Sequence, residues 1–138
     1  MTQVYDIVRG SLLALRVIDA EVAVPAQDMT DGIAALNRMM RRWEADGIAL
    51  GWNDVVGPTD DVPLPPEAEE AVIYNLAVRR RSDYGVSIEP DVLQLATDGL
   101  ARLTADVRGN EFVTTCYGDL PYGTGQSQGW GWREGYFS

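Results

Sequence analysis

The 138-residue chain contains no histidine and no lysine, so all 11 of its basic residues are arginines. Without histidine, the sequence excludes a Ser-His-Asp triad, an HExxH zinc site and an imidazole general base. Without lysine, it excludes a Walker A phosphate loop and Schiff-base chemistry. The single cysteine, Cys116, cannot form an internal disulfide or a multi-cysteine zinc site. We therefore expect no catalytic residues, no cofactor and no metal.

Long apolar runs are also missing, since no segment approaches the roughly 18 residues that cross a membrane. The first residues, MTQVYDIVRG, lack the basic and apolar regions of a signal peptide, so we expect a cytosolic origin and no membrane partner. The 11 arginines face 21 acidic residues, which gives a net charge of −10. Such a charge disfavours a broad surface that neutralises nucleic-acid phosphates.

What the sequence does contain is apolar residues at the helical period. Residues 3–19 predict a first helix with Thr2 as its N-cap, and Gly10 within it either weakens the helix or lets another helix come close. Residues 28–46 predict the clearest helix, and Gly47 suits the left-handed residue after it. An adaptable docking groove is an alternative use of its methionines. The expected core residues are Met29, Ile33, Leu36, Met40, Trp43 and Leu76.

The third predicted helix begins at Pro66 and ends at Gly85. Its middle, AVIYNLAV, is apolar on almost every side, which predicts the most buried helix; the flanking caps decide against a strand. Asn75 within it needs a hydrogen-bond partner if it is buried, in the same chain or in a neighbour. The fourth helix begins near Pro90, with Gly109-Asn110 as its expected stop. Residues 1–110 are thus expected to form an all-α domain, a small four-helix bundle.

Residues 48–66 form a long loop between the second and third helices, with four prolines and two glycines. A connection of this length inside a compact domain is usually functional or disordered, and its apolar content disfavours disorder. We expect Trp43 to pack in the core, whereas the loop faces a partner through Trp52, Asn53 and Asp54.

Two groups of charged residues have competing interpretations. The carboxylates of Glu44, Asp46 and Asp54 could form an acid/base pair for glycoside cleavage, although solvated surface charge is expected in so acidic a chain. The successive residues Arg79–Arg81 point in different directions around a helix, so they cannot form one flat basic face. We expect them to complement the negative end of the helix and to form ion pairs.

The C-terminal residues 111–138 differ in composition from the rest of the chain. They hold seven of its 12 aromatic residues and six of its 14 glycines, with little helical pattern. Aromatic rings favour burial, whereas a glycine-rich segment is typical of disorder. The segment is therefore either an arm folded back on its own bundle or an extended arm that orders on a partner, and composition leaves both open.

Two stretches, LNRMMRRWEADGIALGW and AEEAVIYNLAVRRRSDYG, joined by a proline-rich link, resemble the phage head-to-tail adaptor family that includes the tail accessory factor of short-tailed phages. The shared features are the helix ending in Trp43, the Asp46-Gly47 pair, the run Tyr74–Ala77 and the Tyr84-Gly85 stop. A glycine- and aromatic-rich C-terminal arm fits as well.

The resemblance implies a structural virion protein that is not an enzyme. Its copies would bind side by side as a ring, expected to be dodecameric, beneath the portal protein at the head-tail junction, close the DNA-filled capsid and carry the next tail component, a nozzle or tail-completion protein. DNA would pass through without specific binding. The arm would bind the portal through Phe112, Tyr117, Tyr122, Trp130, Trp132, Tyr136 and Phe137. The alternative is a small acidic cell-wall hydrolase of the muramidase type, for which we find no supporting residue pattern.

Overall fold

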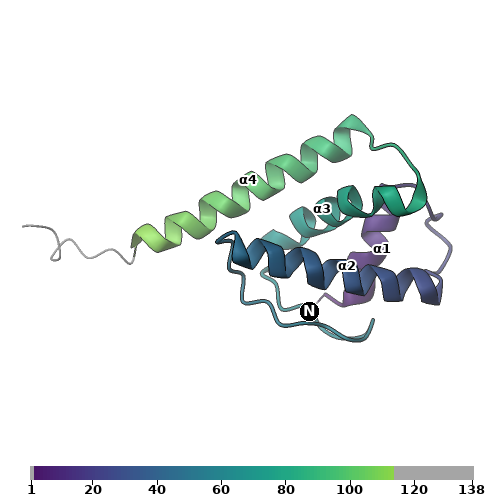
Figure 1. The fold of residues 1–138 in the computed structure, drawn as a ribbon, viewed down its shortest axis with the longest axis horizontal. Coiled ribbons are helices and arrows are strands. Elements are labelled where there is room, and N and C mark those ends of the chain that lie inside the picture. The colour runs from purple at the N-terminus through teal and green to yellow at the C-terminus, as the bar shows by residue number, and fades with distance from the viewer. Residues whose placement is uncertain (1, 114–138) are drawn as a thin grey trace, which may run out of the picture. The chain divides into compact units, whose positions relative to one another are not determined.

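The computed structural model describes residues 2–113, with the backbone alone described for residues 110–113. These residues form four helices, α1 (Val4–Ala14), α2 (Ala26–Ala45), α3 (Pro66–Tyr84) and α4 (Pro90–Val113), and no strand (Figure 1). The predicted all-α bundle is therefore confirmed. No helix in this part of the chain combines the length and apolar character needed to cross a membrane.

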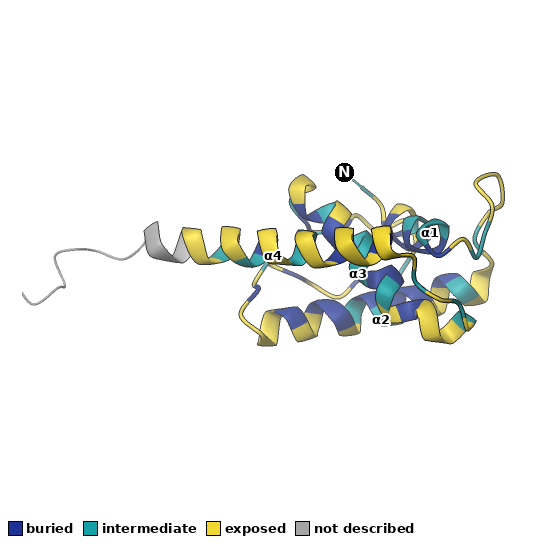
Figure 2. Cartoon of the chain, turned by 90° about the horizontal axis from the view of Figure 1, so that it is seen from above, coloured by how far each residue is buried: buried dark blue, intermediate teal, exposed yellow. Residues whose placement is uncertain are grey.

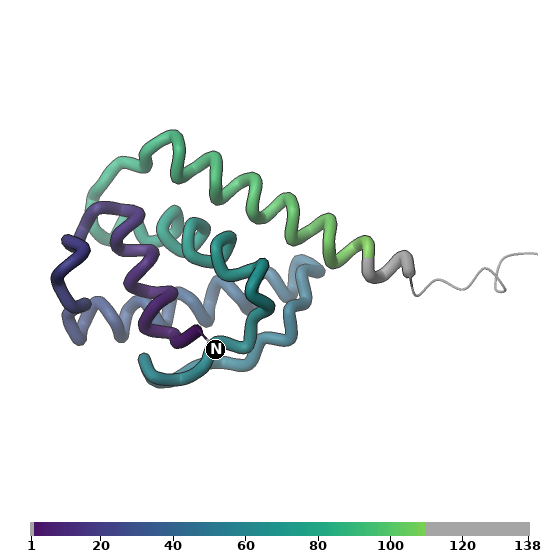
Figure 3. Tube along the Cα trace, turned by 180° about the vertical axis from the view of Figure 1, so that it is seen from behind, coloured from purple at the N-terminus to yellow at the C-terminus, as the bar shows by residue number. Residues whose placement is uncertain are grey.

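Helix α3 is the element that the other three contact, as its apolar sequence predicts. It lies between α4 on one side and α1 and α2 on the other (Figures 1 and 3). Gly10 of α1 faces it closely, since a Cβ atom there would lie 3.2 Å from Ile73 Cγ2. Asn75, which is half-buried, donates from Nδ2 to the carbonyl oxygens of Ala71 at 2.7 Å and Ala96 of α4 at 3.0 Å. Its partner therefore lies in the same chain.

Helix α4 covers α3 with a single narrow row of side chains, so most of its surface is exposed (Figure 2). Up to residue 109, where its side chains are described, Val92, Ala96 and Leu103 are its buried apolar residues. Between them Gly99 lets the two backbones approach, because a Cβ atom there would lie 2.8 Å from Ala71 Cβ and 3.1 Å from Ala71 Cα. Any larger side chain at position 99 would push the helices apart.

The apolar stripe of α2 lies inside the bundle. Met29, Ile33, Leu36, Met40 and Trp43 are all buried, and Leu76 of α3 packs in the same cluster. α2 is followed by Gly47 with φ +95°, and α3 by Gly85 with φ +63°. These are the left-handed residues that the sequence predicts after both helices.

Several predicted boundaries differ from the structure, and one is the start of α2, which lies at Ala26 rather than Asp28. Helix α1 starts one residue later than a Thr2 cap requires, with Gln3 as its N-cap and the Asp6 carboxylate accepting from the Gln3 N–H at 3.4 Å. It ends at Ala14 rather than Asp19, because Arg16 adopts a left-handed φ of +57° that interrupts the helix. At the other end of the chain Gly109 does not stop α4, since its φ is not positive and the helical backbone continues to Val113.

Candidate functional site

The loop between α2 and α3 packs on the bundle and does not face outward as a whole. It buries Ile48, Trp52, Val55, Val62 and Leu64. Trp52 is only 7% exposed, so the expectation that it faces a partner is wrong. The reason lies at the start of α1, whose free N–H groups need acceptors. The Val4 and Tyr5 N–H groups donate to loop carbonyl oxygens at 3.0 and 2.9 Å, which holds the loop over the core.

Two polar side chains of α2 fasten the same loop. Asn37, which no sequence pattern singles out, donates to the Val55 carbonyl at 2.9 Å and accepts from the Val55 N–H at 3.1 Å. One turn further, Arg41 forms a two-pronged ion pair with Asp54. The hydrogen bond and the charge of Arg41 lower the pKa of Asp54. Asn53 and Asp54 remain exposed, so only these two of the three predicted loop residues are available to a partner.

The three carboxylates considered for glycoside cleavage lie on the surface at the end of α2 and in this loop. Asp46 pairs with Arg42 at 3.3 Å, Asp54 pairs with Arg41, and Glu44 is exposed. A glycosidase needs one carboxyl group with a raised pKa to act as the general acid. The lowered pKa of Asp54 is a shift in the opposite direction. The arrangement thus favours surface ion pairing over acid/base chemistry.

Next to the start of α1 the loop shapes an apolar pocket. The Asp60 carboxylate accepts from the N–H groups of Val56 at 3.0 Å and Gly57 at 2.8 Å, which lowers the pKa of Asp60 and fixes the turn. Val56 at this turn is 86% exposed. The pocket has a volume of about 430 Å³ and is lined by Tyr5, Val24, Ala26, Met29, Thr30, Ile33, Val56 and Pro58.

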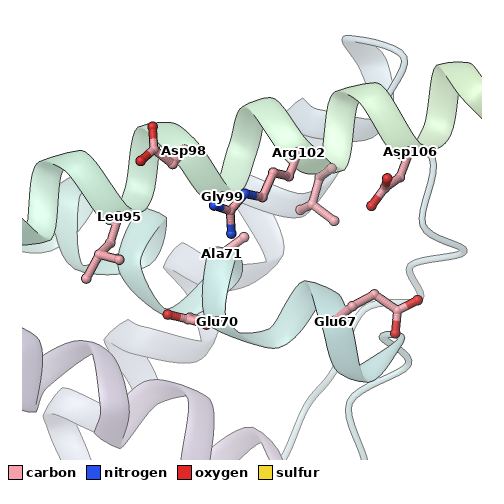
Figure 4. A pocket seen from close by; sticks show the side chains of 9 residues that line it. Glu67, Glu70, Ala71, Leu95, Asp98, Gly99, Arg102 and Asp106 are labelled. Carbon is pink, nitrogen blue, oxygen red and sulfur yellow. The ribbon is translucent and has the colours of Figure 1, made fainter.

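A second depression, the acidic groove, lies between α3 and α4 and has a volume of about 250 Å³ (Figure 4). Its lining residues are Glu67, Glu70, Ala71, Leu95, Asp98, Gly99, Arg102, Leu103 and Asp106. Four carboxylates therefore surround one guanidinium group. Leu95 adds an apolar side chain that is 41% exposed. The groove combines excess negative charge with an apolar margin.

A third depression, the arginine cleft, lies between α2 and α3 and has a volume of about 250 Å³. It is lined by Ala35, Arg38, Arg79, Arg80 and Asp83, so three guanidinium groups face one carboxylate. Arg38 and Arg79 are exposed, whereas Arg80 is only 1% exposed. Arg80 was expected to lie at a charged helix end. Instead its side chain enters the bundle, where a Cβ atom added to Gly32 of α2 would lie 2.9 Å from Nη1.

Arg80 is held by a chain of hydrogen bonds that joins the end of α3 to the start of α2. Its Nη2 donates to the Tyr84 hydroxyl at 2.6 Å, and that hydroxyl donates to Asp28 Oδ1 at 3.0 Å. The guanidinium also lies over the Tyr84 ring, 5.2 Å from its centroid. Within the described residues Nε and Nη1 of Arg80 have no hydrogen-bond acceptor. The positive charge under the cleft is thus only partly compensated.

Tyr84 keeps its proton at high pH. Burial, assisted by the carboxylates of Asp28 and Asp83, raises its pKa from 10.0 to about 12, although the charge of Arg80 acts in the opposite direction. The folded state therefore retains a proton that the unfolded chain loses above pH 10. The resulting stabilisation is complete below pH 10 and is lost as the pH rises towards 12.

We expect Tyr84→Phe to remove this pH dependence. At neutral pH the variant should lose about 1–3 kcal/mol of unfolding free energy, because Arg80 and Asp28 lose their shared partner. Between pH 10 and 12 its urea midpoint should fall less steeply than that of the wild type. Urea unfolding followed by circular dichroism across this range measures both effects. An equally steep fall in the variant would contradict the assignment.

A sequence signal for Arg80 does exist. Val72, Leu76 and Arg80 are spaced by four residues, so Arg80 continues the buried row of α3, whereas Arg79 and Arg81 fall on either side of it. The three arginines appear equivalent only when they are read as a run. The predicted portal-binding residues Tyr117, Tyr122, Trp130, Trp132, Tyr136 and Phe137 lie outside the described residues, and Phe112 lies in the last turn of α4, where only the backbone is described.

Four packed helices with oppositely charged depressions define a small all-α protein. A comparison with family models matches residues 5–137 to the P22 tail accessory factor. Since the match spans nearly the whole chain, the protein belongs to this family and is a structural, virion-associated phage tail protein. A comparison with curated proteins finds no match.

Proposed function

We propose that the protein is a head-to-tail adaptor that binds as a ring beneath the portal protein, closes the DNA-filled capsid and provides the platform for tail attachment. The observation that carries this proposal is the extent of the family match, which runs to residue 137 and so includes the aromatic arm as well as the bundle. In this role residues 1–110 form the adaptor domain and residues 111–138 the portal-binding arm.

The charge and composition of the chain support this role. A conduit for DNA should repel the duplex, and a chain of net charge −10 does so. Aromatic side chains dominate the anchors of protein interfaces, and seven lie in residues 111–138. The further partners are neighbouring adaptor copies in a dodecameric ring and a nozzle or tail-completion protein below it, with the exposed Asn53 and Asp54 as loop contacts. DNA passes through during ejection without specific binding.

Imaging of the protein mixed with the purified portal ring of its phage tests the proposal. A closed ring of additional density at one end of the portal, dependent on residues 112–138, is the expected result. A turbidity assay on purified cell wall tests the alternative, a tail-borne muramidase. Clearance of the wall by the wild type, retained when the arm is removed, would favour the hydrolase instead.

We expect the isolated protein to be mainly monomeric at micromolar concentration, because copies of charge −10 repel one another and the arm has no partner. Ring formation should require the portal as a template. Sedimentation velocity of the free protein, at low and physiological salt, measures this directly. A stable closed ring in the absence of portal would show that the template is unnecessary.

A further inference from the structure

The acidic groove and the arginine cleft lie on opposite faces of α3. At about 100° per residue, the α3 residues that line the groove and those that line the cleft point in directions about 170° apart. These residues are Glu67, Glu70 and Ala71 for the groove, and Arg79, Arg80 and Asp83 for the cleft. The two surfaces therefore cannot meet within one bundle. A second copy can bring one against the other.

Neither surface is neutralised inside its own bundle. The ion pairs among the described residues are Arg16–Glu89, Arg41–Asp54 and Arg42–Asp46. None of them involves the groove carboxylates or the exposed arginines of the cleft, Arg38 and Arg79. Arg80 adds a buried charge beneath the cleft, with two donor nitrogens that have no acceptor in this part of the chain. Carboxylates from outside can therefore pair with the exposed Arg38 and Arg79, while the buried charge of Arg80 adds to the positive field of the cleft. The groove carboxylates, in turn, favour guanidinium groups from outside.

We propose that the occupant of the arginine cleft is the acidic groove of a second copy of this chain. Contact between two different surfaces is head-to-tail, and repetition of such a contact closes a ring when the rotation between copies is suitable. Exposed ion pairs alone contribute little, but Leu95 at the margin of the groove supplies apolar area that partly removes the charges from water. This contact would be the lateral contact between neighbouring copies in the proposed ring, so it rests on the proposed adaptor function.

Cysteine cross-linking in the full chain tests the contact without the portal. In a Cys116→Ser background, Ala34→Cys places a thiol beside the cleft and Ala105→Cys places one beside the groove; both alanines are exposed. Although the free protein is mainly monomeric, a short bismaleimide traps transient contacts covalently. The double variant should therefore accumulate a ladder of dimers, trimers and higher species, because each copy has two different reactive ends. Each single variant should stay monomeric. A control pair, Ala23→Cys with Ala105→Cys, should give no ladder.

Charge reversal shows whether the ladder depends on the proposed surfaces. Arg38→Glu with Arg79→Glu should lower the cross-linking rate about tenfold, and Glu70→Arg with Asp98→Arg should do the same. All four reversals in one chain should restore it, since each reversed cleft then meets a reversed groove. Circular dichroism verifies that the variants fold. Dimers from the single-cysteine variants, or a ladder unaffected by the reversals, would overturn the proposal.

The experiment separates this inference from the proposed function. If imaging shows a ring on the portal but the double variant gives no ladder, the cleft–groove contact is rejected and the adaptor function is supported. If the ladder is charge-dependent but the protein does not bind the portal, the adaptor function is rejected and the cleft–groove contact between copies is supported.

Discussion

Trp43→Ala is expected to lower the unfolding free energy by about 3–5 kcal/mol, a large part of the total stability of a domain of this size. The indole closes the apolar stripe of α2, where it is 3% exposed. Its removal leaves a cavity among Met40, Ile48 and their neighbours in the same cluster, and packed helices collapse into such a cavity only in part. Urea unfolding followed by circular dichroism measures the loss.

Trp52→Ala gives a second test of the same core from the loop side. Because Trp52 is 7% exposed, we expect a loss of several kcal/mol for it as well. Val56→Ala is the matched control within the same loop, since Val56 is 86% exposed and its truncation should change stability by less than about 0.5 kcal/mol. If the Trp52 variant were as stable as the Val56 variant, Trp52 would not be a core residue, and the expectation that it faces a partner would be supported.

The helices were predictable because their signals are local. The stripe of α2, Pro66 at the start of α3 and the left-handed Gly85 at its end depend on residues within a few turns of one another. The end of α1 was less predictable, since apolar residues continue at helical spacing to Ile18 while the backbone turns at Arg16. Periodicity reports which face is apolar, and a single left-handed residue can interrupt the helix without changing that pattern.

The loop and the charged surfaces depend on contacts between distant segments, which a single sequence does not show. Trp52 is buried because the loop supplies hydrogen-bond acceptors to α1, more than 40 residues earlier in the chain. Asn37 holds the loop, but in the sequence it is like any other polar residue on the exposed face of a helix, so the pattern does not single it out. The charges of the groove and the cleft can be compared only once α2 and α4 are placed against α3. Arg80 is the exception, since its spacing of four residues from Leu76 predicts that it continues the buried row of α3.

Removal of residues 112–138 is expected to abolish binding to the portal while the bundle stays folded. The deletion removes seven aromatic residues. The core clusters of the described bundle lie between Val4 and Val107, so helical content and the urea midpoint should change little. Portal binding should fall below detection, because buried tryptophan and tyrosine anchors typically contribute about 2 kcal/mol or more each.

Smaller changes within the arm distinguish an anchor from a structural element. Trp130→Ala with Trp132→Ala should weaken attachment measurably without changing the stability of the free protein, although the ordering of the arm offsets part of the gain from each anchor. The readouts are co-sedimentation with the portal ring and urea unfolding of the same samples. Unfolding of the truncated protein would assign the arm to the core of its own bundle. Full binding by a folded truncated protein would move the docking surface to the bundle, where the exposed Asn53 and Asp54 of the loop are the next residues to reverse or remove.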